Sequence, residues 1–251
     1  MICDLSGLTA IVTGASAGIG RGVCTVLAAS GARIVAVARR ASALEQLIAG
    51  LPGGDELHGR VVADLATKDG VEAVLDFATR LPAVDIVVNN AGTSVPAVAG
   101  TDEATWRKAF AVQFDAPRVI SEAVLAGMAA RKFGRIVLVG GTLEPGETPN
   151  ASTAAKAALV AWAKGLANSV AAGGTTINTV IPGRINSEQV LTLLHPDPAE
   201  RIAFAKTRIP AGRFGEPYEV GNLVAFLSSR QADYITGAVI PIDGGMRRYA
   251  F

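Results

Sequence analysis

The chain of 251 residues is poor in the side chains that build metal clusters, disulfide frameworks and charged interaction surfaces. Its two cysteines are Cys3 and Cys24 and its two histidines are His58 and His195, and no spacing among them resembles a metal site or a disulfide framework. This scarcity predicts a reduced, cytoplasmic setting. A formal net charge of +1 gives no electrostatic reason to expect nucleic acid or an anionic membrane surface as a partner. The N-terminus has no basic leader or long apolar run, so we expect neither a signal peptide nor a membrane span.

Half of the residues are hydrophobic, which suits one large domain over residues 1–251. Short apolar runs rich in β-branched residues alternate with longer helical stretches, and this alternation predicts an α/β fold with a doubly wound parallel sheet and helices on both faces. The seven expected strands are 8–13, 33–38, 61–63, 85–89, 135–139, 176–181 and 239–242. Helices are expected over 19–30, 43–49, 68–80, 103–131, 152–171 and 218–228.

One long connection, residues 184–210, has no expected helix or strand. Long connections in compact domains often form lids over binding sites, so we expect a substrate lid here. Its leucines and other apolar residues indicate that the expected lid forms an apolar wall of the substrate site. Such residues also commonly pack on the body of a domain. His195 lies in the run His-Pro-Asp-Pro, which is more typical of a rigid solvated turn than of a proton-transfer site.

A glycine-rich turn over Thr13–Gly20 joins the first expected strand to the first expected helix. Gly14 permits a tight turn, Gly18 lets the backbone approach a pyrophosphate, and Gly20 lets the helix and the strand pack closely. The helix N-terminus offers its N–H groups to the phosphates. The position between a strand and a helix, close to the N-terminus, favours dinucleotide binding over a purely structural turn.

The second expected strand ends with Arg39 and Arg40, and no carboxylate lies there to bind a ribose 2′-hydroxyl. A guanidinium offers a planar fork to a phosphate, so Arg39 favours NADP(H) over NAD(H) as cofactor. The alternative is that both arginines are solvated charges at the end of a strand.

Several motifs along the chain resemble those of the classical short-chain dehydrogenases/reductases, and in particular the 3-oxoacyl-ACP reductase-like members. Thr13–Gly20 resembles their TGxxxGIG motif and Asn89–Gly92 their NNAG motif. Ile181–Gly183 resembles the PG motif after the sixth strand, and Arg208–Pro217 is similar to the stretch P-x-G-R-x-G-x-P. The closing segment, with Asp243–Gly245, is also similar, so the resemblance covers essentially the whole chain.

The resemblance implies a Rossmann-like sheet, a homo-oligomer that is a dimer or a homotetramer, and a small-molecule substrate. It also implies that Asp64 meets the adenine, that Asn90 lines the cofactor cleft and that Ile181 and Gly183 flank the nicotinamide. The alternative for Asn89 and Asn90 is that they serve only the turn at the end of a strand, for which asparagine is well suited. The residues expected to bind the cofactor are Gly14, Ser16, Gly18, Ile19, Gly20, Arg39, Asp64, Leu65, Asn90, Ala91, Gly92, Lys156, Pro182, Gly183 and Ile185.

The resemblance breaks at the catalytic tetrad of asparagine, serine, tyrosine and lysine. Lys156 matches the lysine that binds the ribose, but Ser152 stands in place of the proton-donating tyrosine, four residues earlier on the same helical face. In the run Val139–Thr142 a glycine stands at the serine position, and Thr142 is the nearest hydroxyl. Gln113 stands near the asparagine position. The catalytic candidates are therefore Lys156, Ser152, Thr142 and Gln113.

No other residue clearly replaces the missing tyrosine. Tyr218, Tyr234 and Tyr249 lie toward the C-terminus, away from the expected position of the donor. A serine hydroxyl is a poor acid, and a positioned general acid contributes about 10²–10⁴ in rate. Glu144 and Glu147 lie in the loop before the expected catalytic helix, and either is a donor if desolvation raises its pKa, although solvated charge is the more common fate of such residues.

Three functions remain open at this point. The first is an NADP(H)-dependent oxidoreductase with an atypical proton donor, acting on a small or medium carbonyl or alcohol or on a conjugated enone. The 2,4-dienoyl-CoA reductases, which also carry Ser-x-x-x-Lys, resemble the chain in part. The second is a non-catalytic dinucleotide-binding protein, a sensor or a partner subunit. The third is a repurposed site for non-redox dehydration or isomerisation, with Glu144, Glu147 or His195 as acid or base.

Overall fold

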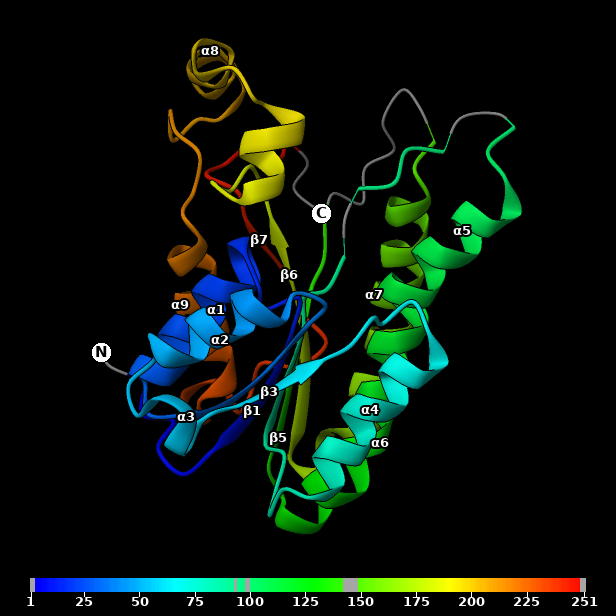
Figure 1. Ribbon diagram of the computed structural model, residues 1–251, viewed down its shortest axis with the longest axis vertical. Coiled ribbons are helices and arrows are strands. Elements are labelled where there is room, and N and C mark those ends of the chain that lie inside the picture. Colours follow the sequence, from blue (N-terminus) through cyan, green and yellow to red (C-terminus); the bar gives the residue numbers. More distant parts are fainter. Residues whose placement is uncertain (1–2, 93, 98–99, 142–148, 249–251) are drawn as a thin grey trace.

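The computed structural model describes residues 3–92, 94–97, 100–141 and 149–248. One parallel sheet of seven strands has the order β3-β2-β1-β4-β5-β6-β7 (Figure 1). The strands are β1 (Thr9–Thr13), β2 (Arg33–Ala38), β3 (Gly59–Val62), β4 (Ile86–Asn89), β5 (Gly134–Val139), β6 (Thr175–Pro182) and β7 (Val239–Ile242). This arrangement confirms the Rossmann-like, doubly wound fold that the sequence predicts.

Helices cover both faces of the sheet, with α1, α2 and α9 on one face and α4, α6 and α7 on the other (Figure 1). The helices are α1 (Gly18–Ala29), α2 (Ala41–Ala49), α3 (Gly54–Leu57), α4 (Lys68–Thr79), α5 (Glu103–Phe110), α6 (Ala116–Arg131), α7 (Ala151–Val170), α8 (Pro198–Arg208) and α9 (Pro217–Ser228). Among the described residues, no helix combines the length and the apolar character needed to cross a membrane.

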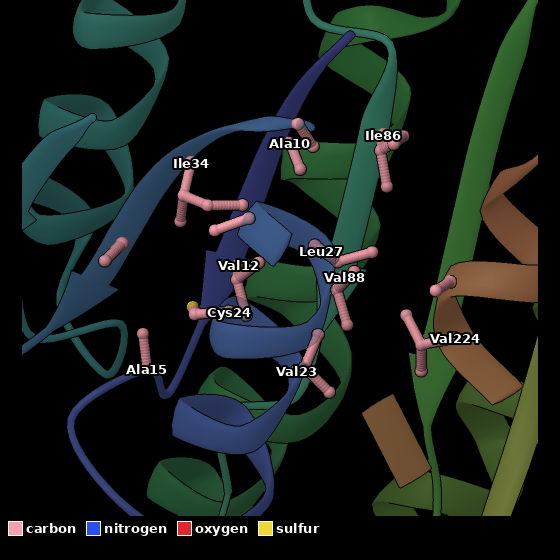
Figure 2. Packing of buried hydrophobic residues seen from close by; sticks show 14 of the residues in the cluster. Ala10, Val12, Ala15, Val23, Cys24, Leu27, Ile34, Ile86, Val88 and Val224 are labelled. Atoms are coloured by element: carbon pink, nitrogen blue, oxygen red, sulfur yellow. The ribbon is translucent and has the colours of Figure 1, made fainter. Parts of the chain in front are cut away.

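Two hydrophobic layers hold the helices to the sheet because alternate residues of each buried strand point to opposite faces. On β1, Val12 packs toward α1 and α9, whereas Ile11 packs toward α4, α6 and α7. Figure 2 shows the first layer, in which Val23 and Leu27 of α1 lie against Val12 and Val88 of the sheet. Burial of strand residues on both faces explains why the strands read as continuous apolar runs.

Two expected elements differ from the sequence prediction. The single helix expected over 103–131 is interrupted by a π-helical turn, Ala111–Asp115, between α5 and α6. Pro117 lies in the first turn of α6, where its missing N–H breaks the regular α-helical ladder. The turn directs Gln113 inward, where its side chain is 2% exposed.

The connection 184–210 was expected to be irregular, and that expectation is wrong. It contains a second π-helical turn, Val190–Leu194, and the helix α8. Asp197 caps α8 by accepting a hydrogen bond from the N–H of Ala199 at 2.8 Å, and Pro198 occupies the first turn. An aspartate before a helix and a proline in its first turn are standard signals for the start of a helix. The sequence therefore contained the evidence for α8.

Candidate active site

A cleft of about 630 Å³ opens at the carboxyl ends of β1 to β5, a volume typical of sites for small ligands and cofactors. The chain runs from β1 to β2 on one side and β4 lies on the other, so the cleft includes the switch point of the sheet, where such folds bind ligands. The predicted site residues that line it are Gly14, Ser16, Gly18, Ile19, Arg39, Asp64, Leu65, Asn90, Ala91, Gly92, Gln113 and Lys156.

The glycine-rich turn has no room for side chains. A Cβ on Gly14, whose φ is +67°, would lie 2.7 Å from Nδ2 of Asn90, and one on Gly20 would collide with the carbonyl oxygen of Gly14. Ala17, the residue that precedes α1, provides no side-chain cap for the first N–H groups of the helix. These donors at the positive end of α1 suit a pyrophosphate, so the turn fits a dinucleotide.

Hydrogen bonds between β1 and β4 hold this turn in place. Oγ1 of Thr13 accepts from the backbone N–H groups of Asn90 at 2.9 Å and Ala91 at 3.0 Å. In return, Nδ2 of Asn90 donates to the carbonyl oxygens of Thr13 at 3.0 Å and Gly14 at 3.2 Å. Asn90 therefore positions the turn as well as lining the cleft. The role of Thr13 was missed from the sequence, although its place before the first glycine was a signal.

Beside the glycine-rich turn, at the end of β2, Arg40 makes ordered contacts with two residues of the cleft. Its guanidinium donates to Oγ of Ser16 at 3.3 and 3.4 Å and to the carboxylate of Glu188 at 2.8 and 3.1 Å. Arg39 lines the same cleft but is exposed. Neither Arg40 nor Glu188 was singled out from the sequence, and no local signal links two residues 148 positions apart.

Lys156 extends from α7 into the cleft. Its ammonium donates to the carbonyl oxygen of Gly140 at 2.9 Å. Burial disfavours the charged form and lowers the pKa of Lys156 to about 8. The neighbouring Gly141 leaves space beside this side chain, because a Cβ there would lie 3.4 Å from Cδ and 3.5 Å from Nζ of the lysine.

Ser152 lies beneath the cleft and is not one of the described residues that line it. Its side chain is buried, and its Oγ accepts a hydrogen bond from Nε2 of Gln113 at 2.7 Å. The amide oxygen of Gln113 is buried with no hydrogen-bond partner among the described residues. Gln113 itself contributes to the lining of the cleft, although this oxygen is inaccessible.

Other predicted cofactor residues lie outside the lining. Pro182 pairs with Ile242 of β7, and the N–H of Gly183 donates to the carbonyl oxygen of Ile242 at 3.0 Å. Ile185 is 3% exposed and belongs to the core, where it forms an isolated bridge with Gly215. Gly20 packs against the turn, as expected for close contact between helix and strand. Thr142, together with Glu144, Glu147 and Tyr249, lies outside the described residues.

His195 packs within the segment 184–210 and does not reach the described lining of the cleft. Its ring lies 4.6 Å from the ring of Phe204 and 5.4 Å from that of Phe214, between centroids. Burial, assisted by the charge of Arg184, lowers the pKa of His195. The ring of His195 is thus half-buried, whereas Pro196 and Asp197 beside it are exposed, in line with the solvated turn expected from the sequence. Tyr218 and Tyr234 are exposed and also lie outside the lining.

Comparison with known proteins finds relatives that match nearly the whole chain. Residues 14–247 match a family model described as enoyl-(acyl carrier protein) reductase. The chain is 36% identical over 249 residues to the 3-oxoacyl-(acyl-carrier-protein) reductase FabG of Vibrio cholerae, covering 97% of this chain and 98% of the relative.

Two solved structures show that the similarity extends to the fold. L-Sorbose reductase of Gluconobacter frateurii, solved with NADPH and L-sorbose, superposes with a TM-score of 0.92 at 29% identity, over 99% of this chain and all of that one. A short-chain type dehydrogenase/reductase of Mycobacterium marinum gives a TM-score of 0.87 at 29% identity, over 99% of this chain and 98% of that one. The chain therefore belongs to the family of NAD(P)-dependent short-chain dehydrogenases/reductases.

Proposed function

We propose that this chain is an NADP(H)-dependent oxidoreductase that acts on a small or medium carbonyl or alcohol or on a conjugated enone, with an atypical proton donor. The observation that carries the proposal is a single cleft with the glycine-rich turn at one end and the ammonium of Lys156 at the other. A reductase needs both a place for the dinucleotide and a source of a proton beside the substrate.

The preference for NADP(H) is supported by two arginines, Arg39 and Arg40, that line the cleft at the end of β2. A guanidinium binds a phosphate through paired hydrogen bonds, whereas a ribose hydroxyl is usually held by a carboxylate at this place. The solved L-sorbose reductase contains NADPH, which agrees with this choice.

Lys156 is the proton donor that the site supports best. When bound, the reduced cofactor supplies a hydride to the substrate carbon. The substrate then carries a developing negative charge on oxygen, which takes a proton from the ammonium of Lys156. A donor whose pKa lies near 8 is well matched to transfer at neutral pH, whereas a serine hydroxyl is not. A conjugated enone suits this donor because its negative charge is delocalised and needs a weaker acid.

Consumption of NADPH across panels of ketones, quinones and enoyl substrates tests the proposal. We expect turnover with at least one panel and binding of NADPH in a calorimetric titration. Binding without turnover on any panel would favour a non-catalytic sensor or partner subunit instead. Activity without consumption of cofactor would favour the non-redox alternative. Turnover of NADPH, binding without turnover, and activity without consumption of cofactor thus point to the three functions in turn.

A further inference from the structure

Glu188 meets Arg40 across the mouth of the cofactor cleft. Arg40 directly precedes α2 at the end of β2, and Glu188 lies in the segment that leads into the π-helical turn of the lid. Nη2 of the arginine donates to Oε2 of the glutamate at 2.8 Å and Nη1 to Oε1 at 3.1 Å. Both residues line the cleft, so this paired contact lies within the proposed cofactor site.

The same guanidinium also contacts the glycine-rich turn, through Oγ of Ser16. Arg40 therefore joins three segments at one point: the turn, the end of the second strand and the lid. The end of the second strand is where folds of this kind read the 2′ substituent of the adenosine ribose. A phosphate at that substituent would seek the same two N–H groups that Glu188 now occupies.

The lid approaches the turn at a second point beside this contact. A Cβ on Gly18 would lie 2.9 Å from Cβ of Ser187, the residue next to Glu188. The backbone of the lid thus holds the carboxylate close to the expected path of the dinucleotide. A phosphate and a carboxylate facing each other at one guanidinium repel, because like charges at short range are destabilising.

We propose that Glu188 is a specificity-determining residue that competes with the 2′-phosphate of NADP(H) for Arg40. A dinucleotide with a 2′-phosphate must displace the carboxylate, whereas one with a 2′-hydroxyl leaves the ion pair intact. Glu188 therefore lowers the preference for NADP(H) below the value that the arginine alone would give. The inference rests on the proposed dinucleotide site. It adds the residue that sets how strongly this site prefers NADP(H) to NAD(H).

Because Arg40 and Glu188 are exposed, a phosphate can replace the carboxylate at the guanidinium. The side chains of Arg40 and Glu188 are 51% and 54% exposed, and ion pairs in contact with water are weak. A phosphate near its full double charge is a stronger partner for a guanidinium than one carboxylate is. The glutamate thus moderates binding of the phosphate without preventing it.

Calorimetric titration with two small probes tests the proposal without any turnover. Adenosine 2′,5′-bisphosphate carries the 2′-phosphate and adenosine 5′-diphosphate does not. We expect Glu188→Gln to tighten binding of the first probe about three- to tenfold and to leave the second within twofold. Arg40→Met should weaken the first probe, and Glu188→Gln added to that variant should tighten this probe less than it does in the unmodified protein, since the two residues act as a pair.

Glu200→Gln is the matched control, because it removes one negative charge from exposed α8, away from the lining of the cleft. Equal tightening by Glu200→Gln, or equal tightening of both probes by Glu188→Gln, would overturn the proposal. So would an unchanged affinity for adenosine 2′,5′-bisphosphate. Failure of both probes to bind the unmodified protein would instead contradict the proposed dinucleotide site itself.

Discussion

Lys156 is the residue on which the proposed chemistry of the cleft depends most. Because burial lowers its pKa to about 8, the ammonium is the dominant form below that pH and is lost above it. If the ammonium donates the proton, kcat/KM for reduction should be level below about pH 7 and fall as pH rises through 8. Initial rates of NADPH oxidation between pH 6 and 10 measure this. A profile that stays level to pH 10 would contradict the role.

Lys156→Arg separates charge from acidity at the same position. A guanidinium keeps the positive charge for the ribose but does not release a proton near neutral pH. We expect kcat to fall about 10²–10⁴-fold while the dissociation constant for NADPH changes only a few-fold. Glu144→Gln and Glu147→Gln are comparison variants. A loss of kcat in either that equals the loss in Lys156→Arg would assign the donor to the loop.

The pair of Gln113 and Ser152 predicts a cost in stability. Ser152→Ala leaves the buried Nε2 of Gln113 without the hydrogen bond now made at 2.7 Å. An unsatisfied buried donor costs about 1–3 kcal/mol, so the free energy of unfolding in urea should fall by about that amount. The double variant Gln113→Leu/Ser152→Ala removes both polar groups and should recover part of the loss. A double variant less stable than the single one would contradict the explanation.

The single residues also mark the limit of what the sequence predicts about the site. Gly14, Gly18 and Gly20 follow from a motif because the backbone itself imposes their roles. The contact of Arg40 with Glu188 does not, since it joins the end of β2 to a segment 148 positions further along the chain. The burial of Ser152 under Gln113 likewise depends on a π-helical turn, which a propensity pattern does not reveal.

At the scale of elements, α1 and α9 approach each other closely. A Cβ on Gly22 of α1 would lie 2.7 Å from the backbone carbonyl carbon of Pro217 in α9. Gly22→Ala should therefore lower the free energy of unfolding by about 1–3 kcal/mol through overpacking. Gly165→Ala is the matched control, because Gly165 lies inside α7 with nothing within 4 Å of the added Cβ. It should raise stability by about 0.5–1 kcal/mol.

Thermal or urea unfolding of the two variants distinguishes packing from helix propensity. If both substitutions raise the stability, the claim that α9 leaves no room for a Cβ at Gly22 is contradicted. If both lower it, overpacking is not specific to that helix pair. The opposite signs expected for one chemical change follow directly from the different surroundings of the two glycines.

Most elements follow from the sequence because strand and helix periods are locally encoded. The seven strands lie within two residues of their expected ends, since each is a short apolar run bounded by turns. The helix α8 was missed because its start signal, Asp197 followed by a proline, was read as a turn. The interruption at Ala111–Asp115 was missed because the apolar pattern continues through it.

At the scale of the whole molecule, the sheet has two open edges, at β3 and β7. The strand β7 is the less covered of the two C-terminal strands, and Val239 within it is 40% exposed. Unpaired strand edges with apolar side chains favour association with another chain. We therefore expect a homo-oligomer, a dimer or a tetramer, in which the β7 edge is covered by a second copy.

Light scattering coupled to size exclusion measures the mass directly, and a dimer or tetramer gives two or four times the 25.6 kDa of the chain. Val239→Lys places a charge at the expected interface and should shift the mass toward that of the monomer, because a buried lysine without a partner disfavours association. Lysine at Val62, which is 53% exposed on the opposite edge strand β3, is the matched control and should leave the mass unchanged. Equal dissociation by both variants would place the interface elsewhere, and a monomeric mass for the unmodified protein would show that the β7 edge is stable when exposed.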